Sequence, residues 1–198
     1  MRYKPDQKAR AREALVQAGA RSLKSAGFNG IGVDGLAASA GVTSGAFYSN
    51  FPNKEAMLEA VIDDLVGEPF VSETDSATFD EGRSRLHGFV ADYISTDHSS
   101  DPAAGCVMPA LSADVSRAQP SVKQAYERKI STLAQRIAAF LDGDESDRER
   151  RAWSIVSLMV GALTISRAMP EGGSRAAAID AARRTAISLI DADTADSR

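Results

Sequence analysis

The sequence predicts an all-α protein of about nine helices. Alanine is abundant in the 198 residues, whereas aromatic residues and β-branched runs are sparse, and alanine is the strongest helix former. Apolar residues recur at three- and four-residue spacing in most segments, which is typical of a helix with one buried face. The composition, 43% apolar and 25% charged, is that of an ordinary globular protein.

The first two predicted helices cover residues 8–26 and 33–40. Gly27 follows the first as its expected left-handed C-cap. Gly41 closes the second. The short stretch between them contains turn residues, so we expect two helices joined by a loop.

A third and a fourth helix follow directly. Thr43 is a good N-cap for the third helix, because its hydroxyl can accept from a first-turn amide. Phe47 and Phe51 are four residues apart, so they share a face and bury together. Pro52 cannot continue that helix but suits the first turn of the next one, over residues 53–66.

A helix, a tight turn and a second helix with a polar exposed face form a helix-turn-helix unit. The second helix of such a unit fits the major groove of B-DNA, which is about 12 Å wide. Gly45 allows the helix to approach the DNA closely, and Ser44 and Asn50 are the expected base readers. Tyr48 and Lys54 are placed to contact phosphate, although Tyr48 could instead be a core aromatic. The candidate DNA-contacting residues are Thr43, Ser44, Gly45, Tyr48, Ser49, Asn50 and Lys54.

The charges divide unevenly along the chain. Residues 1–60 hold eight Lys and Arg against five Asp and Glu, whereas the remainder holds fifteen against twenty-two. Most of the positive excess lies in the first 25 residues, in Arg2, Lys4, Lys8, Arg10, Arg12, Arg21 and Lys24. A basic end on an acidic body suggests that this end meets a polyanion; a merely solvated basic tail is the alternative.

Several residues stand at fixed separations between residues 10 and 58, namely Gly27-Phe28, Leu36-Ala37, Ala40-Gly41-Val42, Gly45, Phe47-Tyr48, Phe51, Lys54 and Leu58. In these residues the segment resembles the DNA-binding domain of the TetR family of bacterial transcription regulators. The resemblance implies a homodimer, a third helix in the major groove, and release of DNA when a small ligand binds the C-terminal domain.

Two positions depart from the family pattern. Asn50 stands where the family often has His, and it can still donate to phosphate or read adenine. The family often has Ser or Thr near the start of its second helix, where this chain has Ile31-Gly32-Val33. The phosphate contact would then pass to the amide of Gly32 or Val33, which adds both residues to the candidate DNA-contacting set.

The remaining chain is expected to form a second helical domain at residues 53–198, after a DNA-binding domain at residues 1–52. The C-terminal part serves ligand binding and dimerisation in this interpretation. Its expected elements are a mobile connector at 67–82, helices at 83–96, 106–117, 120–141, 148–169 and 176–190, a loop at 98–105, and a frayed tail after residue 191.

The segment 148–169 is apolar on two faces, so a helix there must bury both. One face can meet its own core, and the other needs a partner. With the helix at 176–190 it could dock onto a twofold mate as a four-helix bundle, and the family resemblance points to the same two helices. The candidate dimer residues are Val156, Val160, Leu163, Arg167, Ile179 and Ala186.

A second set of aromatic, apolar and hydroxyl side chains lies on helices that could converge. Effector pockets are mostly apolar with a few polar groups, and these residue types match that description. Ordinary core packing is the alternative for any single member. The candidate pocket residues are Phe89, Tyr93, Met108, Leu111, Ser112, Tyr126, Trp153 and Ser157.

The sequence offers little for enzyme chemistry, a metal or a cofactor. His87 and His98 stand alone, and no carboxylate pair stands with His or Cys at metal-ligand spacing. The single cysteine, Cys106, favours packing over a redox switch and fits a reducing compartment. No apolar run of about 18 residues and no signal peptide are evident, so we expect a cytoplasmic protein without a membrane segment.

These observations predict a homodimeric, ligand-responsive regulator that binds double-stranded DNA at a palindromic operator, as a repressor released by a small apolar or aromatic effector. Two alternatives stay open. One is a helical small-molecule-binding protein or enzyme in which the helix-turn-helix is only structural. The other is a regulator that acts through a protein partner.

Overall fold

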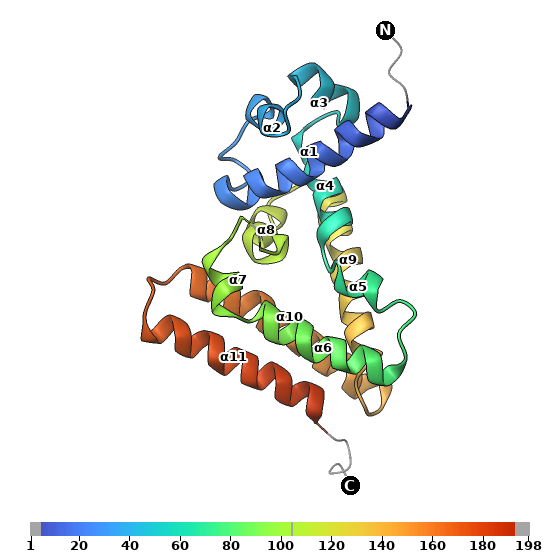
Figure 1. Cartoon of the computed structure of the whole chain (residues 1–198), viewed down its shortest axis with the longest axis vertical. Helices are drawn as coiled ribbons and strands as arrows, with labels where there is room; N and C mark the ends of the chain where they lie inside the picture. The colour runs from blue at the N-terminus through green and yellow to red at the C-terminus, as the bar shows by residue number, and fades with distance from the viewer. Residues whose placement is uncertain (1–4, 104, 193–198) are drawn as a thin grey trace. The chain divides into compact units, whose positions relative to one another are not determined.

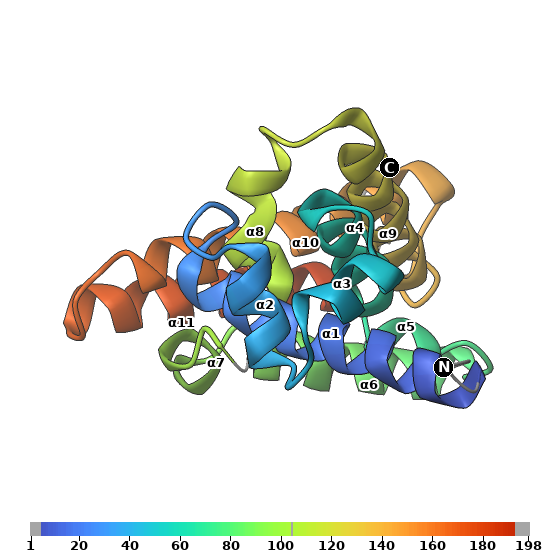
Figure 2. The same ribbon diagram turned by 90° about the horizontal axis from the view of Figure 1, so that it is seen from above.

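The structure, a computed structural model, describes residues 5–103 and 105–192. Its regular structure in these ranges is entirely helical, which confirms the all-α prediction (Figure 1; Figure 2 gives the view from above). The helices are α1 (Pro5–Ala26), α2 (Val33–Ser39), α3 (Ser44–Asn50), α4 (Lys54–Leu65), α5 (Phe70–Glu73), α6 (Phe79–Tyr93), α7 (Thr96–Ser100), α8 (Val107–Val115), α9 (Pro120–Ala138), α10 (Glu145–Arg167) and α11 (Gly173–Asp191). Apart from α5 and α7, each corresponds to a predicted segment.

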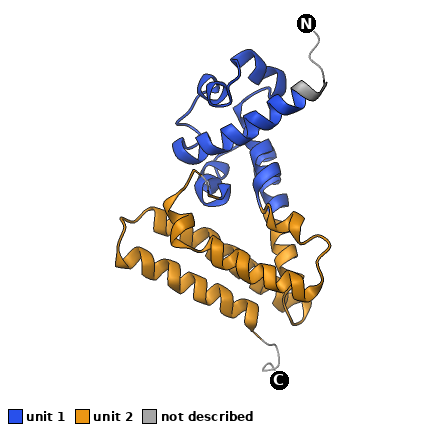
Figure 3. Cartoon of the chain, in the orientation of Figure 1, with its two compact units in different colours: residues 1–66, 106–129 blue, residues 67–105, 130–198 orange. Residues whose placement is uncertain are grey.

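The chain forms two compact units (Figure 3). Unit 1 consists of Met1–Val66 and Cys106–Lys129, and unit 2 of Gly67–Gly105 and Ile130–Arg198. Helix α9 therefore contributes to both units. This grouping follows packing alone, and the functional boundary after residue 52 stays a prediction.

The core of unit 1 forms where α1 packs against α2, α3, α4 and α8. The apolar stripe predicted for α1 is buried through Leu15 and Leu23, and α3 enters the same core through Phe47. Burial of side chains of this size contributes about 1.5–3 kcal/mol each. These contacts hold the short helices α2 and α3, which are too short to be stable alone.

The predicted caps of the helix-turn-helix are confirmed. Gly27 and Gly41 adopt φ values of 72° and 68°, the left-handed region that other residues rarely occupy. The Thr43 hydroxyl accepts from the Ala46 amide at 3.2 Å. The fourth helix begins one residue later than expected, because Asn53 caps α4 and accepts from the Ala56 amide at 2.8 Å.

Two predictions about irregular segments are wrong. The expected mobile connector at 67–82 contains α5 and the start of α6, because Phe70 is buried and stacks on Phe89 with ring centroids 4.5 Å apart. The expected loop at 98–105 contains part of α7, which Ser95 caps by accepting from the His98 amide. Both helices are single turns with too few apolar residues to give a periodic signal.

In unit 2, α11 packs against α10 and α6, and two arginines bind its last carbonyl groups. Arg151 on α10 is only 1% exposed; it donates to the Leu189 carbonyl at 2.8 Å and to the Asp147 carboxylate at 2.7 Å. Arg83 on α6 donates to the Ile190 carbonyl at 2.9 Å. The C-terminal end of α11 is thus satisfied by side chains from two other helices.

Two glycines of α6 differ in surroundings and should respond oppositely to alanine. A Cβ at Gly82 would overlap the ring of Phe140, whereas one at Gly88 would meet nothing within 4 Å. We expect Gly82→Ala to lower the free energy of unfolding by about 1–3 kcal/mol through overpacking. Gly88→Ala should raise it by about 0.5–1 kcal/mol through helix propensity. Urea denaturation followed by circular dichroism measures both; equal effects would contradict this packing.

Candidate nucleic-acid interface

Helix α3 presents one face to the core of unit 1 and another to solvent. Phe47 is fully buried, and its ring centroid lies 5.8 Å from that of Phe51. These two rings define the face of α3 that packs inward. Tyr48 is 57% exposed and touches Phe47 only edge-on, with centroids 5.5 Å apart. Gly45 and Ser49, one turn apart, lie on the exposed side with Tyr48. The exposed position predicted for Tyr48 is therefore confirmed.

The small polar side chains of α3 make hydrogen bonds within the motif. The Ser44 hydroxyl donates to the Asp34 carboxylate at 2.5 Å, and thereby links α3 to α2. Ser49 donates to the carbonyls of Gly45 and Ala46 at 3.1 and 2.9 Å. Because these hydroxyl protons are used internally, neither serine presents a free donor on this face.

Asn50 is also turned inward. Its side-chain amide donates to the Ala46 carbonyl at 2.8 Å, and its Oδ1 atom is buried without a hydrogen-bond partner among the described residues. The prediction that Asn50 reads bases requires an exposed amide, which this rotamer does not provide. The amide is bonded to the backbone one turn earlier in α3 instead.

Lys54 occupies a different position from the one its predicted phosphate contact implies. Its Nζ atom donates to the carbonyls of Phe28 and Ile31, the latter at 3.0 Å, and lies 4.2 Å from the centroid of the Phe28 ring. The ammonium group therefore ties α4 to the α1–α2 loop. Cation–π contacts and hydrogen bonds to two carbonyls both favour this arrangement over a freely extended side chain.

A residue that the sequence analysis missed acts on the same loop. Asp114 on α8 accepts from the Phe28 amide at 3.0 Å. Arg117 donates to the other oxygen of that carboxylate, also at 3.0 Å. Asp114 lies 86 residues from Phe28, and no short-range spacing could have predicted the contact.

The remaining predicted DNA-contacting residues lie on α1 and at the start of α2. Gly32 is the N-cap of α2 with extended backbone and no side-chain hydrogen bond, and Val33 follows as the first helical residue. Without a capping side chain, the first-turn amides of α2 keep their donor capacity. Lys8 is exposed on α1, whereas Arg2 and Lys4 lie outside the described residues. Arg12 stacks on Phe51, with its guanidinium carbon 4.7 Å from the ring centroid.

The predicted effector residues belong to both units and fall into separate groups. In unit 1, Met108 and Leu111 are buried, and the Tyr126 hydroxyl lies 2.7 Å from the Ser112 hydroxyl. Burial raises the pKa of Tyr126 above its ordinary value, while the hydrogen bond with Ser112 partly opposes this rise. Tyr126 therefore stays protonated at neutral pH and can donate or accept a hydrogen bond.

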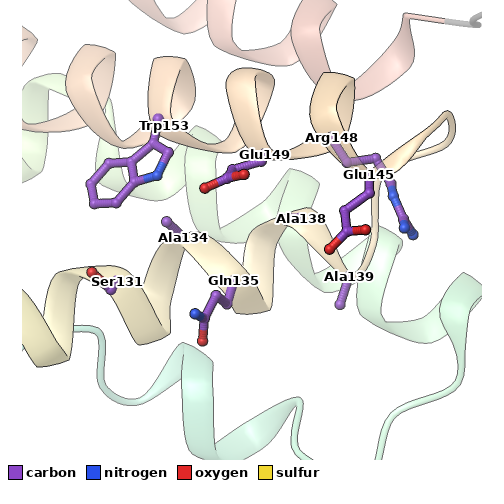
Figure 4. Close-up of a pocket in the computed structure, with 9 residues that line it drawn as sticks. All are labelled: Ser131, Ala134, Gln135, Ala138, Ala139, Glu145, Arg148, Glu149 and Trp153. Atoms are coloured by element: carbon purple, nitrogen blue, oxygen red, sulfur yellow. The ribbon is translucent and has the colours of Figure 1, made fainter.

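The other effector candidates lie in unit 2. The rings of Phe89 and Tyr93 are in edge-on contact, with centroids 5.8 Å apart. Trp153 and Ser157 lie on the exposed side of α10. Of the predicted pocket residues, Trp153 lines a hollow of about 480 Å³ between α9 and α10 (Figure 4). Its other lining residues are Ser131, Ala134, Gln135, Ala138, Ala139, Glu145, Arg148 and Glu149.

The predicted dimer residues serve mainly to pack unit 2. Val156, Leu163, Ile179 and Ala186 are buried within the chain, where α10 meets α11. Val160 is half-buried. These side chains thus lie on the face of α10 and α11 that is already covered within the chain. The sequence pattern could not distinguish the two apolar faces of α10, so the covered face was predicted as the dimer interface. A large apolar side chain left exposed on α10 is Ile165, at 52%.

Arg167 was also predicted at the dimer interface. Its guanidinium donates to the His98 carbonyl at 2.8 Å and so ties α10 to α7. In residues 5–103 and 105–192, no group of three or more His, Cys, Asp or Glu side chains could hold a metal ion. Within the same residues, no helix is long and apolar enough to cross a membrane.

Comparison with known proteins gives one family and many similar folds. Residues 15–61 match the model of "Bacterial regulatory proteins, tetR family". The comparison with curated proteins gave no match. The fold is similar to that of a TetR-family regulator from Cytophaga hutchinsonii, with TM-score 0.75 and 20% identity over 96% of this chain and 97% of that one.

Two further structures show the same likeness. Escherichia coli NemR in its reduced form gives TM-score 0.69 and 19% identity over 88% of this chain and 95% of its own. Bacillus subtilis FadR in complex with stearoyl-CoA gives TM-score 0.66 and 14% identity over 90% and 97%. At such identities these structures establish the fold alone. The family model assigns residues 15–61, from α1 into α4, to the TetR family of bacterial transcription regulators, and the similar structures show that the fold of the whole chain is one found in such regulators.

Proposed function

We propose that the protein is a homodimeric repressor that binds a palindromic operator with α3 in the major groove and releases it when a small effector binds. The observation that carries this proposal is the exposed face of α3, with Gly45, Tyr48 and Ser49, inside the segment that matches the family model. A helix of this kind, supported by a preceding helix across a tight turn, suits major-groove docking.

Phosphate contacts would come from residues around α3. The hydroxyl of Tyr48, the first-turn amides of α2 and the side chain of Lys8 are the donors that can reach the DNA backbone. Residues 1–60 carry an excess of positive charge, which supports the assignment of DNA contact to this part of the chain. We propose that DNA binding resides in residues 1–52 and that residues 53–198 serve effector binding and dimerisation.

The proposed effector is apolar or aromatic. Support comes from the buried Met108 and Leu111 on α8, beside the hydrogen-bonded Ser112 and Tyr126. FadR, one of the structural relatives, was solved with stearoyl-CoA, a ligand with a long apolar chain. An effector releases the DNA only if its affinity differs between the two arrangements of the protein.

The leading experiment is a gel shift of the purified chain with the promoter DNA that flanks its own gene. A specific complex whose affinity falls steeply with salt is expected, because phosphate contacts release counterions. Turnover of a small molecule with no DNA affinity at moderate salt would instead support the helical enzyme or carrier.

Tyr48→Ala should weaken DNA binding without weakening the fold. Tyr48 is 57% exposed, so its removal leaves no cavity. The loss of one phosphate contact should lower DNA affinity about tenfold across sequences and reduce the salt slope by about one. Fluorescence anisotropy at several salt concentrations measures both quantities. Wild-type affinity in the Tyr48→Ala variant would mean that another surface meets the DNA.

Lys54→Ala should act through the fold. The variant loses two hydrogen bonds from a charged donor to the α1–α2 loop, so the free energy of unfolding should fall by about 1–3 kcal/mol. DNA affinity should fall with it, because the loop positions α2. Lys123→Ala, at an exposed position on α9, is the matched control. Unchanged stability of Lys54→Ala would restore the direct phosphate contact as its main role.

The proposed dimer would use the exposed side of α10 and α11. Ile165 is 52% exposed in the single chain, so an aspartate there is tolerated by the monomer but disfavoured in a helix–helix interface. We expect Ile165→Asp to shift the protein from dimer to monomer in sedimentation velocity with its helical content unchanged. Ser84→Asp, at an exposed position on α6, should leave the dimer intact. A dimeric Ile165→Asp variant would exclude this face.

A further inference from the structure

We propose that α3 recognises its operator half-site through a thymine 5-methyl group seated against Gly45, and not through bidentate hydrogen bonds to a base. This inference rests on the proposed function and names the chemical feature of DNA that the same surface reads. It goes beyond the family assignment, which leaves open how bases are distinguished.

The serine and asparagine side chains of the motif make internal hydrogen bonds. Bidentate reading of guanine uses Arg or Lys, and bidentate reading of adenine uses Asn or Gln. Between residues 33 and 50, all of which the structure describes, Asn50 alone is of these types. Its amide donates to the Ala46 carbonyl, and its Oδ1 atom is buried. No side chain in this stretch is therefore set to make a bidentate base contact.

The serine hydroxyl groups of the motif are used in the same way. Ser39 on α2 donates to the Leu36 carbonyl at 2.8 Å, and Ser44 donates to Asp34 at 2.5 Å. Ser49 folds its hydroxyl onto the carbonyls of Gly45 and Ala46. Beside the exposed Tyr48, the part of this face between Gly45 and Ser49 presents mainly carbon-bound hydrogens, because the Ser49 hydroxyl is turned to the backbone. Such a surface suits an apolar group of the DNA.

Gly45 has no structural requirement for glycine. It lies within α3 and is not among the glycines with positive φ. A Cβ at this position would meet only the Thr43 hydroxyl, at 3.7 Å, which is an ordinary contact. Glycine inside a helix reduces stability relative to alanine. On the exposed face of α3 the missing Cβ permits a close approach by a group outside the chain, and the thymine 5-methyl is the apolar group that projects into the major groove.

The first test removes methyl groups from the DNA. The full chain is used to select its preferred duplex from random sequences, and each thymine of a half-site is then replaced by uracil, which keeps base pairing. We expect at least one uracil to lower affinity about fourfold, the value of one buried methyl group. Replacement of guanine by 7-deazaguanine, which removes the N7 acceptor, should change affinity by less than about twofold at every position under α3.

The second test adds a methyl group to the protein. Gly45→Ala should melt no lower than wild type, yet bind the selected duplex about tenfold more weakly because two methyl groups compete for one space. The uracil duplex should restore most of that affinity, since it vacates the space. Gly88→Ala, which adds a methyl to an open position on α6, should bind both duplexes like wild type.

The outcomes separate this inference from the proposed function. The inference would be overturned if no thymine-to-uracil replacement changed the affinity of specific binding, or if that affinity depended on guanine N7 under α3. Either result would leave the proposed function as a regulator unaffected. A loss of affinity in Gly45→Ala that uracil does not rescue would also overturn it, in favour of close approach to a phosphate. Failure to select any duplex would overturn the proposed function and the inference together.

Discussion

The helix-turn-helix depends on how the backbone of Phe28 is held. Its amide donates to Asp114 of α8 at 3.0 Å, its carbonyl accepts from Lys54 of α4, and its ring lies 4.2 Å from the same ammonium. The backbone N–H and C=O of Phe28 are therefore each hydrogen-bonded to a charged side chain, the first to Asp114 and the second to Lys54. Charged partners make such hydrogen bonds stronger than neutral ones. Two helices that are distant in sequence, α4 and α8, therefore fix the loop that precedes α2.

These contacts connect the α1–α2 loop, next to the helix-turn-helix, to the rest of unit 1. Lys54 opens α4, and Asp114 lies on α8 with Met108, Leu111 and the Ser112–Tyr126 pair. Asp114 on α8 accepts from the Phe28 amide, in the loop that precedes α2, and Ser44 on α3 donates to Asp34 on α2. The geometry thus gives a contiguous physical connection between proposed effector residues and α3.

The sequence predicted what depends on neighbours in the chain. The left-handed Gly27 and Gly41 and the Thr43 cap are set by residues within one helical turn, and all three are confirmed. Contacts made over long distances were not predictable from spacing. Lys54 was expected at phosphate because its side chain can extend, and only the fold brings two carbonyls within its reach. The apolar faces of α10 were interchangeable in sequence, so buried packing residues such as Leu163 were predicted at the dimer interface.

The same internal bonds that shape α3 also limit what it can offer to DNA. Ser44 joins α3 to α2 through Asp34, whereas Ser49 and Asn50 donate to carbonyl groups of α3 itself. A side chain that fixes the motif cannot at the same time present its donor to a base without breaking that bond. Affinity and specificity are therefore carried by different groups in this interpretation. We propose that exposed cations such as Lys8 provide attraction to any phosphate backbone, whereas discrimination depends on how closely the exposed surface of α3 around Gly45 fits the base edges.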